Sequence, residues 1–275
     1  MEKILKRIAK SMLFLFAGIG FVLCFGYIAV RFGLTKTKGT IDVQTKKFIE
    51  PELAKKEVYT PFPLAHTEEW IAFRQAVTKD KALLEKVSKE TGVSERLLIS
   101  ILVPEQMRLF YTERPLFKSV FEPLKVLGSQ SQFSWGIFGI KDDTARDIEN
   151  HLLDKTSPFY LGTSFEKTLS FTTNDTDEER FQRIINEHNH FYSYLYTALY
   201  VRQIESQWKK AGFSIINRPE IIATLWNVGF EKSKPKKDPS SGGSTLVINN
   251  TTFSFGELAK LFYDSDEMIE LFPKK

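Results

Sequence analysis

The chain has 275 residues, of which 42% are hydrophobic and 26% charged. These values are typical of globular proteins, so they exclude a fibrous or wholly disordered chain and favour one main domain with a sizeable core. The net charge of +4 is small and no block of Lys and Arg is interleaved with aromatic residues, so no nucleic-acid partner is expected. The single cysteine, Cys24, excludes a disulfide within the chain and a thiolate metal site.

The N-terminal region has the pattern of a membrane anchor. Residues 1–10 are a short basic segment, and residues 11–30 contain no charged side chain, which is enough for a helix of about 20 residues to cross a bilayer. A cleaved signal peptide is the alternative, but no small-residue cleavage pattern follows. We therefore predict an uncleaved transmembrane signal anchor over residues 11–31 and a tether over residues 32–66.

The folded domain is predicted to begin at residue 67 with two helices. Thr67 can cap a helix that begins at Glu68 and continues to Gly92. The next helix begins after Ser94 and is apolar on most of its circumference, so it should be central, and Pro104 should bend or end it just before Glu105. A carboxyl group in apolar surroundings is harder to ionise, so we expect the pKa of Glu105 to rise, as a general acid requires.

The remaining elements are predicted mainly from capping residues and apolar spacing. Asp142 or Asp143 should cap a helix to about Leu153, and a capping-box pattern of Thr176 and Glu179 should start a long helix that Gly212 ends. Before these helices we expect a long loop over residues 108–132. After them we expect a helix over residues 219–229, a hairpin over residues 246–253 around Asn249-Asn250, and a last helix over residues 255–272.

Three short segments occur in a fixed order between these elements: Val103-Pro104-Glu105, then Gly136-Ile137-Phe138-Gly139-Ile140-Lys141-Asp142-Asp143-Thr144-Ala145, then Leu225-Trp226-Asn227-Val228-Gly229. This order resembles the lysozyme-like domain of soluble lytic transglycosylases and goose-type lysozymes, over residues 80–235. In that family a helix ends in the catalytic Glu, a Gly-Leu-Met-Gln-Ile-x-Pro-x-Thr-Ala segment follows, and an Ala-Tyr-Asn-Ala-Gly segment comes later. The chain departs from the pattern at four places: Gly139 for Gln, Asp142 for Pro, Trp226 for Tyr, and Pro104-Glu105-Gln106 where Glu-Ser is usual.

The resemblance implies a mostly α-helical, lysozyme-like domain over residues 67–275, with a small β-hairpin, outside the cytoplasm behind a single-pass anchor in the cell membrane. It implies cleavage of peptidoglycan between N-acetylmuramic acid and N-acetylglucosamine, with Glu105 as the single general acid and base. The sugar's own 6-hydroxyl then gives a 1,6-anhydro product, and neither a cofactor nor a metal is expected. The substrate-binding residues would be Gly136, Ile137, Phe138, Gly139, Trp226 and Asn227.

Two other functions stay open. The changes at Gly139 and Trp226 favour a peptidoglycan-binding or scaffold protein that keeps the fold without turnover. A hydrolytic muramidase would need a second carboxylate across the bond from the acid. Four carboxylates are near enough in the sequence to be candidates, and none is assigned: Glu113, Glu122, Asp142 and Asp143.

Several of these residues also have structural explanations. Gly136 and Gly139 could allow a turn or tight packing, and Trp135 and Phe138 are aromatic residues of the kind that usually lie in a core. Asn227 is typical of a helix C-terminus. The pair His188 and His190 is not expected to bind a metal, because no third ligand has a recognisable spacing.

Overall fold

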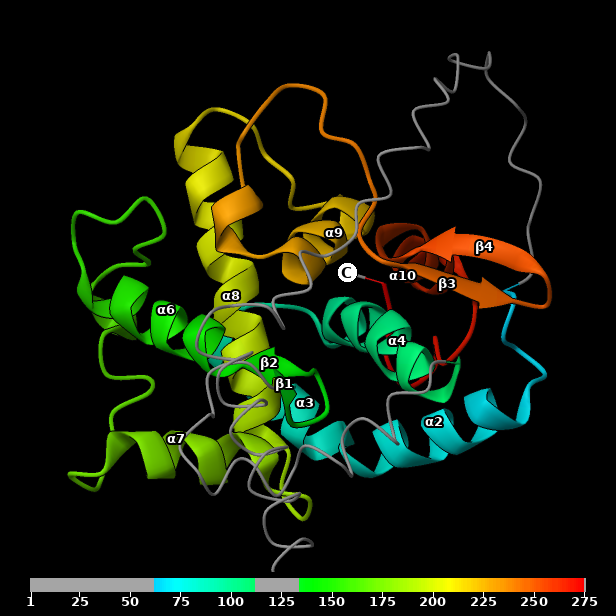
Figure 1. Cartoon of the computed structure of the whole chain (residues 1–275), viewed down its shortest axis with the longest axis horizontal. Coiled ribbons are helices and arrows are strands. Elements are labelled where there is room, and N and C mark those ends of the chain that lie inside the picture. The colour runs from blue at the N-terminus through cyan, green and yellow to red at the C-terminus, as the bar shows by residue number, and fades with distance from the viewer. Residues whose placement is uncertain (1–61, 112–133, 275) are drawn as a thin grey trace, which may run out of the picture.

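The computed structural model describes residues 62–111 and 134–274, and these residues form a mostly helical domain (Figure 1). The elements within them are α2 (Glu68–Lys79), α3 (Lys81–Thr91), α4 (Glu95–Tyr111), β1 (Ser134–Trp135), β2 (Ile140–Lys141), α6 (Asp142–Leu153), η3 (Thr163–Phe165), α7 (Thr176–Ile185), α8 (Phe191–Lys210), α9 (Pro219–Val228), η4 (Phe230–Lys232), β3 (Thr245–Ile248), β4 (Thr251–Ser254) and α10 (Phe255–Asp264). The predicted anchor at residues 11–31 lies outside the described residues. Among the helices that are described, none has the length and apolar character needed to span a membrane.

The first predicted helix is divided into two. Thr67 caps α2 as expected, since its hydroxyl accepts a hydrogen bond from the N–H of Trp70 at 3.2 Å, and Gly92 ends α3 in a left-handed conformation. The prediction of one continuous helix is wrong, because the chain turns at Asp80. The N–H of Asp80 bonds to the carbonyl of Val77, three residues back, and its carboxylate is bound by His190, just before α8, and by Tyr194 of α8.

Helix α4 lies at the centre of the domain, in contact with α2, α3, α8, α9 and α10 (Figure 1). The prediction that Pro104 bends or ends this helix before Glu105 is wrong as to its end, because the helix continues through Pro104 to Tyr111. An internal proline costs about 3 kcal/mol in an exposed helix. Packing on nearly all sides offsets this cost, and the side chains from Glu95 to Glu105 are all buried.

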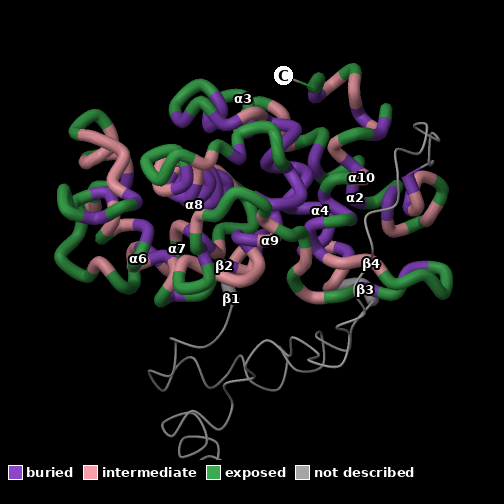
Figure 2. The backbone as a smooth tube through the Cα atoms, turned by 90° about the horizontal axis from the view of Figure 1, so that it is seen from above, coloured by how far each residue is buried: buried purple, intermediate pink, exposed green. Residues whose placement is uncertain are grey.

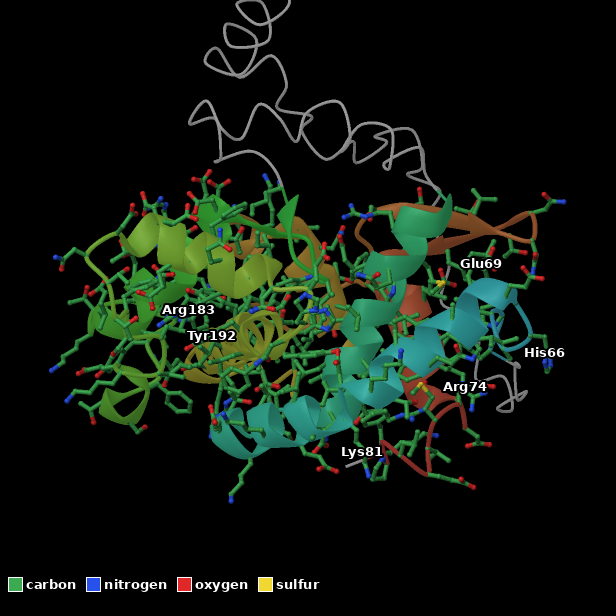
Figure 3. All side chains as sticks on the ribbon, turned by 90° about the horizontal axis from the view of Figure 1, so that it is seen from below. His66, Glu69, Arg74, Lys81, Arg183 and Tyr192 are labelled. Atoms are coloured by element: carbon green, nitrogen blue, oxygen red, sulfur yellow. The ribbon has the colours of Figure 1, made fainter. Side chains whose placement is uncertain are left out.

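The long helix predicted from Thr176 to Gly212 is two helices, α7 and α8, so that prediction is wrong. Asn186 breaks it, because its side-chain oxygen accepts hydrogen bonds from the N–H groups of His188 and Asn189. The predicted capping box is absent, since Asp175 caps α7 and Glu179 binds the N–H groups of two preceding threonines. The two helices stay in contact: Arg183 lies 4.5 Å from the ring centroid of Tyr192 (Figure 3).

The C-terminal elements follow the prediction up to residue 264. Strands β3 and β4 form the expected antiparallel hairpin, with Thr245 opposite Ser254, and Ser254 with Glu257 forms a capping box at the start of α10. The last helix was predicted to reach Phe272 but ends at Asp264. Its final carbonyls, and those of the segment that follows, are bound by the guanidinium of Arg96 on α4.

The buried residues form one core along α4 and α8, with exposed residues around its edge (Figure 2). Phe62 and Leu64, which fall in the predicted tether, belong to this core. The ring centroid of Phe62 lies 4.7 Å from that of Trp70 and 5.8 Å from that of Phe262. The packed domain therefore begins earlier than Thr67.

Candidate functional site

Glu105 lies in the second half of α4 and is 3% exposed. Because the helix is continuous through Pro104, Arg108 stands one turn further on, on the same face. Its Nη2 lies 2.6 Å from Oε1 of Glu105, and the side chain of Arg108 is 22% exposed against 4% for that of Glu105. The candidate acid is therefore buried, and an arginine binds one of its oxygens.

The glycine-rich segment is tied to α4 beside Glu105. Strands β1 and β2 pair in antiparallel fashion, and the turn between them, residues 136–139, is closed by a hydrogen bond from the N–H of Gly139 to the carbonyl of Gly136 at 3.2 Å. The side-chain amide of Gln106 donates a hydrogen bond to the carbonyl of Ile137. The residue that follows the candidate acid thus holds the turn against the central helix.

Phe138 joins this turn to α9 and α8. Its side chain is 1% exposed, and its ring centroid lies 5.9 Å from that of Trp226 and 5.6 Å from that of Tyr194, both edge to face. Trp226 is 9% exposed and packs in the same way on Tyr200, at 4.9 Å. Edge-to-face pairs of this kind fix ring orientation. The structure therefore brings Phe138 and Trp226 into contact within one aromatic cluster, as part of the core.

The two glycines of the turn have conformational reasons for being glycine. Both have positive φ, +65° at Gly136 and +61° at Gly139. A Cβ at Gly136 would lie 2.4 Å from the carbonyl oxygen of Ile184 and 2.9 Å from Oγ of Ser193. Close packing of the turn on α7 and α8 therefore accounts for Gly136 without a ligand.

Asn227 holds the loop that leads to β3. Its side-chain oxygen accepts a hydrogen bond from the N–H of Ser244 at 2.7 Å, and a Cβ at Gly243 would lie 2.8 Å from the same oxygen. One turn earlier, the hydroxyl of Thr224 accepts a hydrogen bond from the N–H of Gly242 at 2.9 Å. The side-chain oxygen of Asn227 is thus engaged within the fold, near the C-terminal end of α9.

The candidates for a second carboxylate fall into two groups. Glu113 and Glu122 lie outside the described residues. Asp142 is buried, and its Oδ2 accepts a hydrogen bond from Arg146 at 2.8 Å, while its Oδ1 lies 3.6 Å from Nη1 of Arg180. Arg180 in turn binds both oxygens of Glu149 at 2.6 Å. Asp142 therefore belongs to a buried ionic network between α6 and α7, and Asp143 beside it is exposed.

The histidine pair lies in the break between α7 and α8. Nδ1 of His190 is 2.6 Å from Oδ2 of Asp80, and the hydroxyl of Tyr194 donates a hydrogen bond to the same oxygen at 2.9 Å. The hydrogen bond to Asp80 raises the pKa of His190 above its ordinary value, against the opposing effect of burial. His188 is exposed, and the described residues hold no group of three side chains arranged as metal ligands.

Comparisons with protein-family models, with curated proteins and with solved structures find no match for this chain.

No role was predicted from the sequence for three residues of this region: Gln106, Arg108 and Tyr194. Their contacts depend on tertiary structure or on the continuity of α4, which the sequence pattern did not predict. The identity of Gln106 was itself a signal, since it is a longer polar side chain where the resembled family has serine next to the acid.

Proposed function

We propose that this chain is a membrane-anchored, lytic transglycosylase-like enzyme of peptidoglycan, with Glu105 as its single general acid and base. The predicted anchor at residues 11–31 would hold the domain at the cell membrane, on the extracytoplasmic side where peptidoglycan lies. The proposal rests on the sequence resemblance and on the way in which its three segments meet in space.

One observation supports the proposal: the three motif segments, far apart in sequence, are joined to one another by side-chain contacts. The first segment contributes Glu105 and is followed by Gln106, which binds the carbonyl of Ile137 in the second. The second contributes Phe138, whose ring contacts Trp226 in the third. Helices α4 and α9, which carry the first and third segments, are also in direct contact. If the three short patterns matched the family only by chance, there would be no reason for the segments to contact one another.

The chemistry that this arrangement would perform needs one carboxyl group. Glu105 as the acid gives its proton to the glycosidic oxygen as the bond from that oxygen to the anomeric carbon breaks. The resulting carboxylate then takes the proton of the muramyl 6-hydroxyl, whose oxygen bonds to the same carbon and closes the 1,6-anhydro ring. Glu105 ends protonated as it began, and no water is consumed.

The test is mass spectrometry of purified peptidoglycan incubated with the full-length chain in detergent, wild type beside Glu105→Gln. The substitution keeps the shape of the side chain and removes the acid. We expect anhydro-muropeptides from the wild type and a loss of about 100-fold or more in the variant, the usual effect of removing a general acid. Products with a free reducing end would instead identify a hydrolytic muramidase.

A second candidate function, a peptidoglycan-binding or scaffold protein, is favoured by two observations. Oε1 of Glu105 is held by Arg108, and Phe138 and Trp226 are packed in the core rather than presented to solvent. A pull-down with insoluble peptidoglycan distinguishes the two functions. Retention of both the wild type and Glu105→Gln on the wall material, with no product of either kind, would establish the scaffold function in place of the enzyme.

A further inference from the structure

A cluster of lysines lies at the end of the domain where α8 finishes. The segment 232–237 contains four lysines and no acidic residue, so it alone carries as much positive charge as the net +4 of the whole chain. Two further lysines occupy the last turn of α8. All six residues are exposed, and together they are called the basic end here: Lys209, Lys210, Lys232, Lys234, Lys236 and Lys237.

The lysine-bearing segment is fixed to α8 by Ser233, which is buried between two exposed lysines. The hydroxyl of Ser233 accepts a hydrogen bond from Nε1 of Trp208 at 2.9 Å and donates one to Oε1 of Gln207 at 2.6 Å. Its carbonyl accepts a third from the side-chain amide of Gln207 at 3.1 Å. Because Ser233 points inward, Lys232 and Lys234 on either side of it are left in solvent. The two groups of lysines therefore belong to one surface at the end of α8.

One large apolar side chain is exposed at the same end of the domain. The loop after α8 is held by a hydrogen bond from the N–H of Phe213 to the carbonyl of Trp208 at 2.9 Å, and by Ile215, which is 2% exposed. The next residue, Ile216, is 59% exposed. Trp208 thus contacts both the loop that carries Ile216 and the segment that carries the lysines, at the end of α8 drawn uppermost in Figure 1.

The charge of the basic end is not neutralised within residues 62–111 and 134–274. Four other lysines of these residues lie within 4.0 Å of a carboxylate: Lys81, Lys86, Lys155 and Lys260. No described carboxylate lies so near to a lysine of the basic end. Nζ of Lys210 bonds to the carbonyls of Pro158 and Tyr160, at 3.2 and 2.9 Å, but a carbonyl carries no compensating charge. Glu231 and Asp238 flank the lysine run without interrupting it.

We propose that the basic end docks on an anionic lipid surface, with its lysines at the phosphate groups and Ile216 at the boundary with the acyl chains. A lysine is a compact point charge that pairs with phosphates in many arrangements, and both charge attraction and buried apolar area strengthen binding to an anionic membrane. The predicted anchor at residues 11–31 would hold the domain within reach of such a surface, because the chain from residue 32 to residue 61 can span at most about 100 Å. Docking of this kind does not require turnover by Glu105.

The test uses the full-length chain reconstituted with vesicles of phosphatidylcholine, or of an equimolar mixture of phosphatidylcholine and phosphatidylglycerol. A water-soluble N-hydroxysuccinimide ester acetylates accessible lysines, and peptide mass spectrometry measures each rate relative to that of Lys86, an exposed residue of α3. We expect Lys232 and Lys234 to react at least about threefold more slowly with the anionic vesicles than with the neutral ones. Sodium chloride at about 0.5 M, where the Debye length is about 4 Å, should remove this protection.

Two charge-matched variants separate the basic end from a general effect of positive charge. Lys236→Gln combined with Lys237→Gln should abolish the protection of Lys234, because each lysine at an anionic surface is worth about fivefold in partitioning. Lys79→Gln combined with Lys89→Gln removes two exposed charges from α2 and α3 and should leave that protection unchanged. Circular dichroism checks that each variant is folded.

The variant Ile216→Ser leaves the charge as it is and should still lower the protection, because its apolar contribution to binding is lost. Equal reaction of Lys234 with the two kinds of vesicle would overturn the docking surface. Protection that is unaffected by Ile216→Ser, or that insoluble peptidoglycan produces and anionic vesicles do not, would overturn the lipid as its partner.

Release of anhydro-muropeptides by the same proteins keeps this proposal apart from the proposed function. Protection of Lys234 by anionic vesicles without any product would support the docking surface and count against the enzyme. Product from a wild type whose Lys234 is not protected would support the enzyme and overturn the docking surface.

Discussion

Nδ1 of His190 lies 2.6 Å from Oδ2 of Asp80, 110 residues earlier in the chain, and this contact joins the start of α8 to the corner between α2 and α3. The hydroxyl of Tyr194, one turn further along α8, donates to the same oxygen, and the Tyr194 ring packs on Phe138. Glu187 also faces His190 and adds to the increase in its pKa. Tyr194 thus connects the ion pair of His190 and Asp80 to the aromatic cluster of the candidate site.

This pair makes stability depend on pH in a defined direction. Because the pKa of His190 is higher in the folded protein than in the unfolded chain, the stabilisation is complete below the ordinary histidine pKa of about 6.5 and is lost as pH rises through the folded-state value. We expect His190→Gln to lower the free energy of unfolding by about 1 kcal/mol near pH 6, and by less near pH 9. Urea unfolding at the two values measures the difference.

The control for this prediction is His188→Gln, which changes an exposed histidine two residues earlier. It should have the same small effect at both pH values. An effect of His190→Gln that grows with pH would contradict the assignment of the pair.

Truncation of Arg96 is predicted to destabilise the domain strongly. It is fully buried on α4, and its N–H groups donate to five main-chain carbonyls of the C-terminal region: Phe262, Tyr263, Ser265, Glu267 and Phe272. Arg96→Met would leave these acceptors without their donor, and we expect a loss of at least about 3 kcal/mol in the free energy of unfolding. Thermal unfolding followed by circular dichroism measures it.

Arg74 supplies the comparison for Arg96. It is an exposed residue of α2 (Figure 3), and its Nη1 lies 3.7 Å from the carboxylate of Glu267 in the same C-terminal segment. Arg74→Met should cost less than about 1 kcal/mol, as surface pairs do. Equal losses from the two substitutions would mean that the buried carbonyls do not depend on Arg96.

Gly136 is predicted to tolerate no side chain. Gly136→Ala would place a Cβ 2.4 Å from the carbonyl oxygen of Ile184 at a φ of +65°, so both the backbone conformation and the contact are unfavourable. We expect a loss of about 3 kcal/mol or more. Gly212→Ala separates the two causes, because Gly212 has a φ of +85° with no atom within 4 Å of the Cβ position. It should lose only about 1 kcal/mol in the same denaturation experiment.

Gln106 is predicted to hold the turn of the first hairpin on α4. Gln106→Leu removes the donor to the carbonyl of Ile137 at similar volume, and we expect about 1 kcal/mol less stability locally. Amide hydrogen exchange should become faster at the turn, with Gly139 as the reporter. Gln182→Leu removes an exposed bond to Glu178 on α7 and should leave exchange at Gly139 unchanged.

Local sequence signals predicted the beginnings of helices better than their ends. Thr67, Pro219 and the Asn249-Asn250 turn occupy the expected positions, because each acts through its own backbone or its neighbours. The end of α10 was not predictable in this way, since it depends on Arg96 of a distant helix. The break after α7 has a local cause at Asn186, but the apolar spacing on both sides indicated one helix.

The same distinction applies to the candidate site. The order of the three segments could be identified from sequence, but the contact of Phe138 in the second with Trp226 in the third is known only from the structure. The ion pair of Glu105 with Arg108 could not be predicted while Pro104 was expected to end the helix. Whether a proline is accommodated depends on how completely neighbouring helices surround it, and that is a property of the assembled core.

The five hydrogen bonds of Arg96 also have a consequence for how the chain matures. The carbonyls that Arg96 binds lie 166 to 176 residues further along the sequence. Helix α4 is therefore synthesised long before the residues that pack on its first turn. Until residues 262–272 have been synthesised, the guanidinium of Arg96 lacks the main-chain carbonyls that it binds in the folded domain, and water must hydrate it instead. The helix that carries Glu105 therefore completes its packing late, and a chain interrupted before residue 262 would lack all five carbonyls that Arg96 binds in the folded domain.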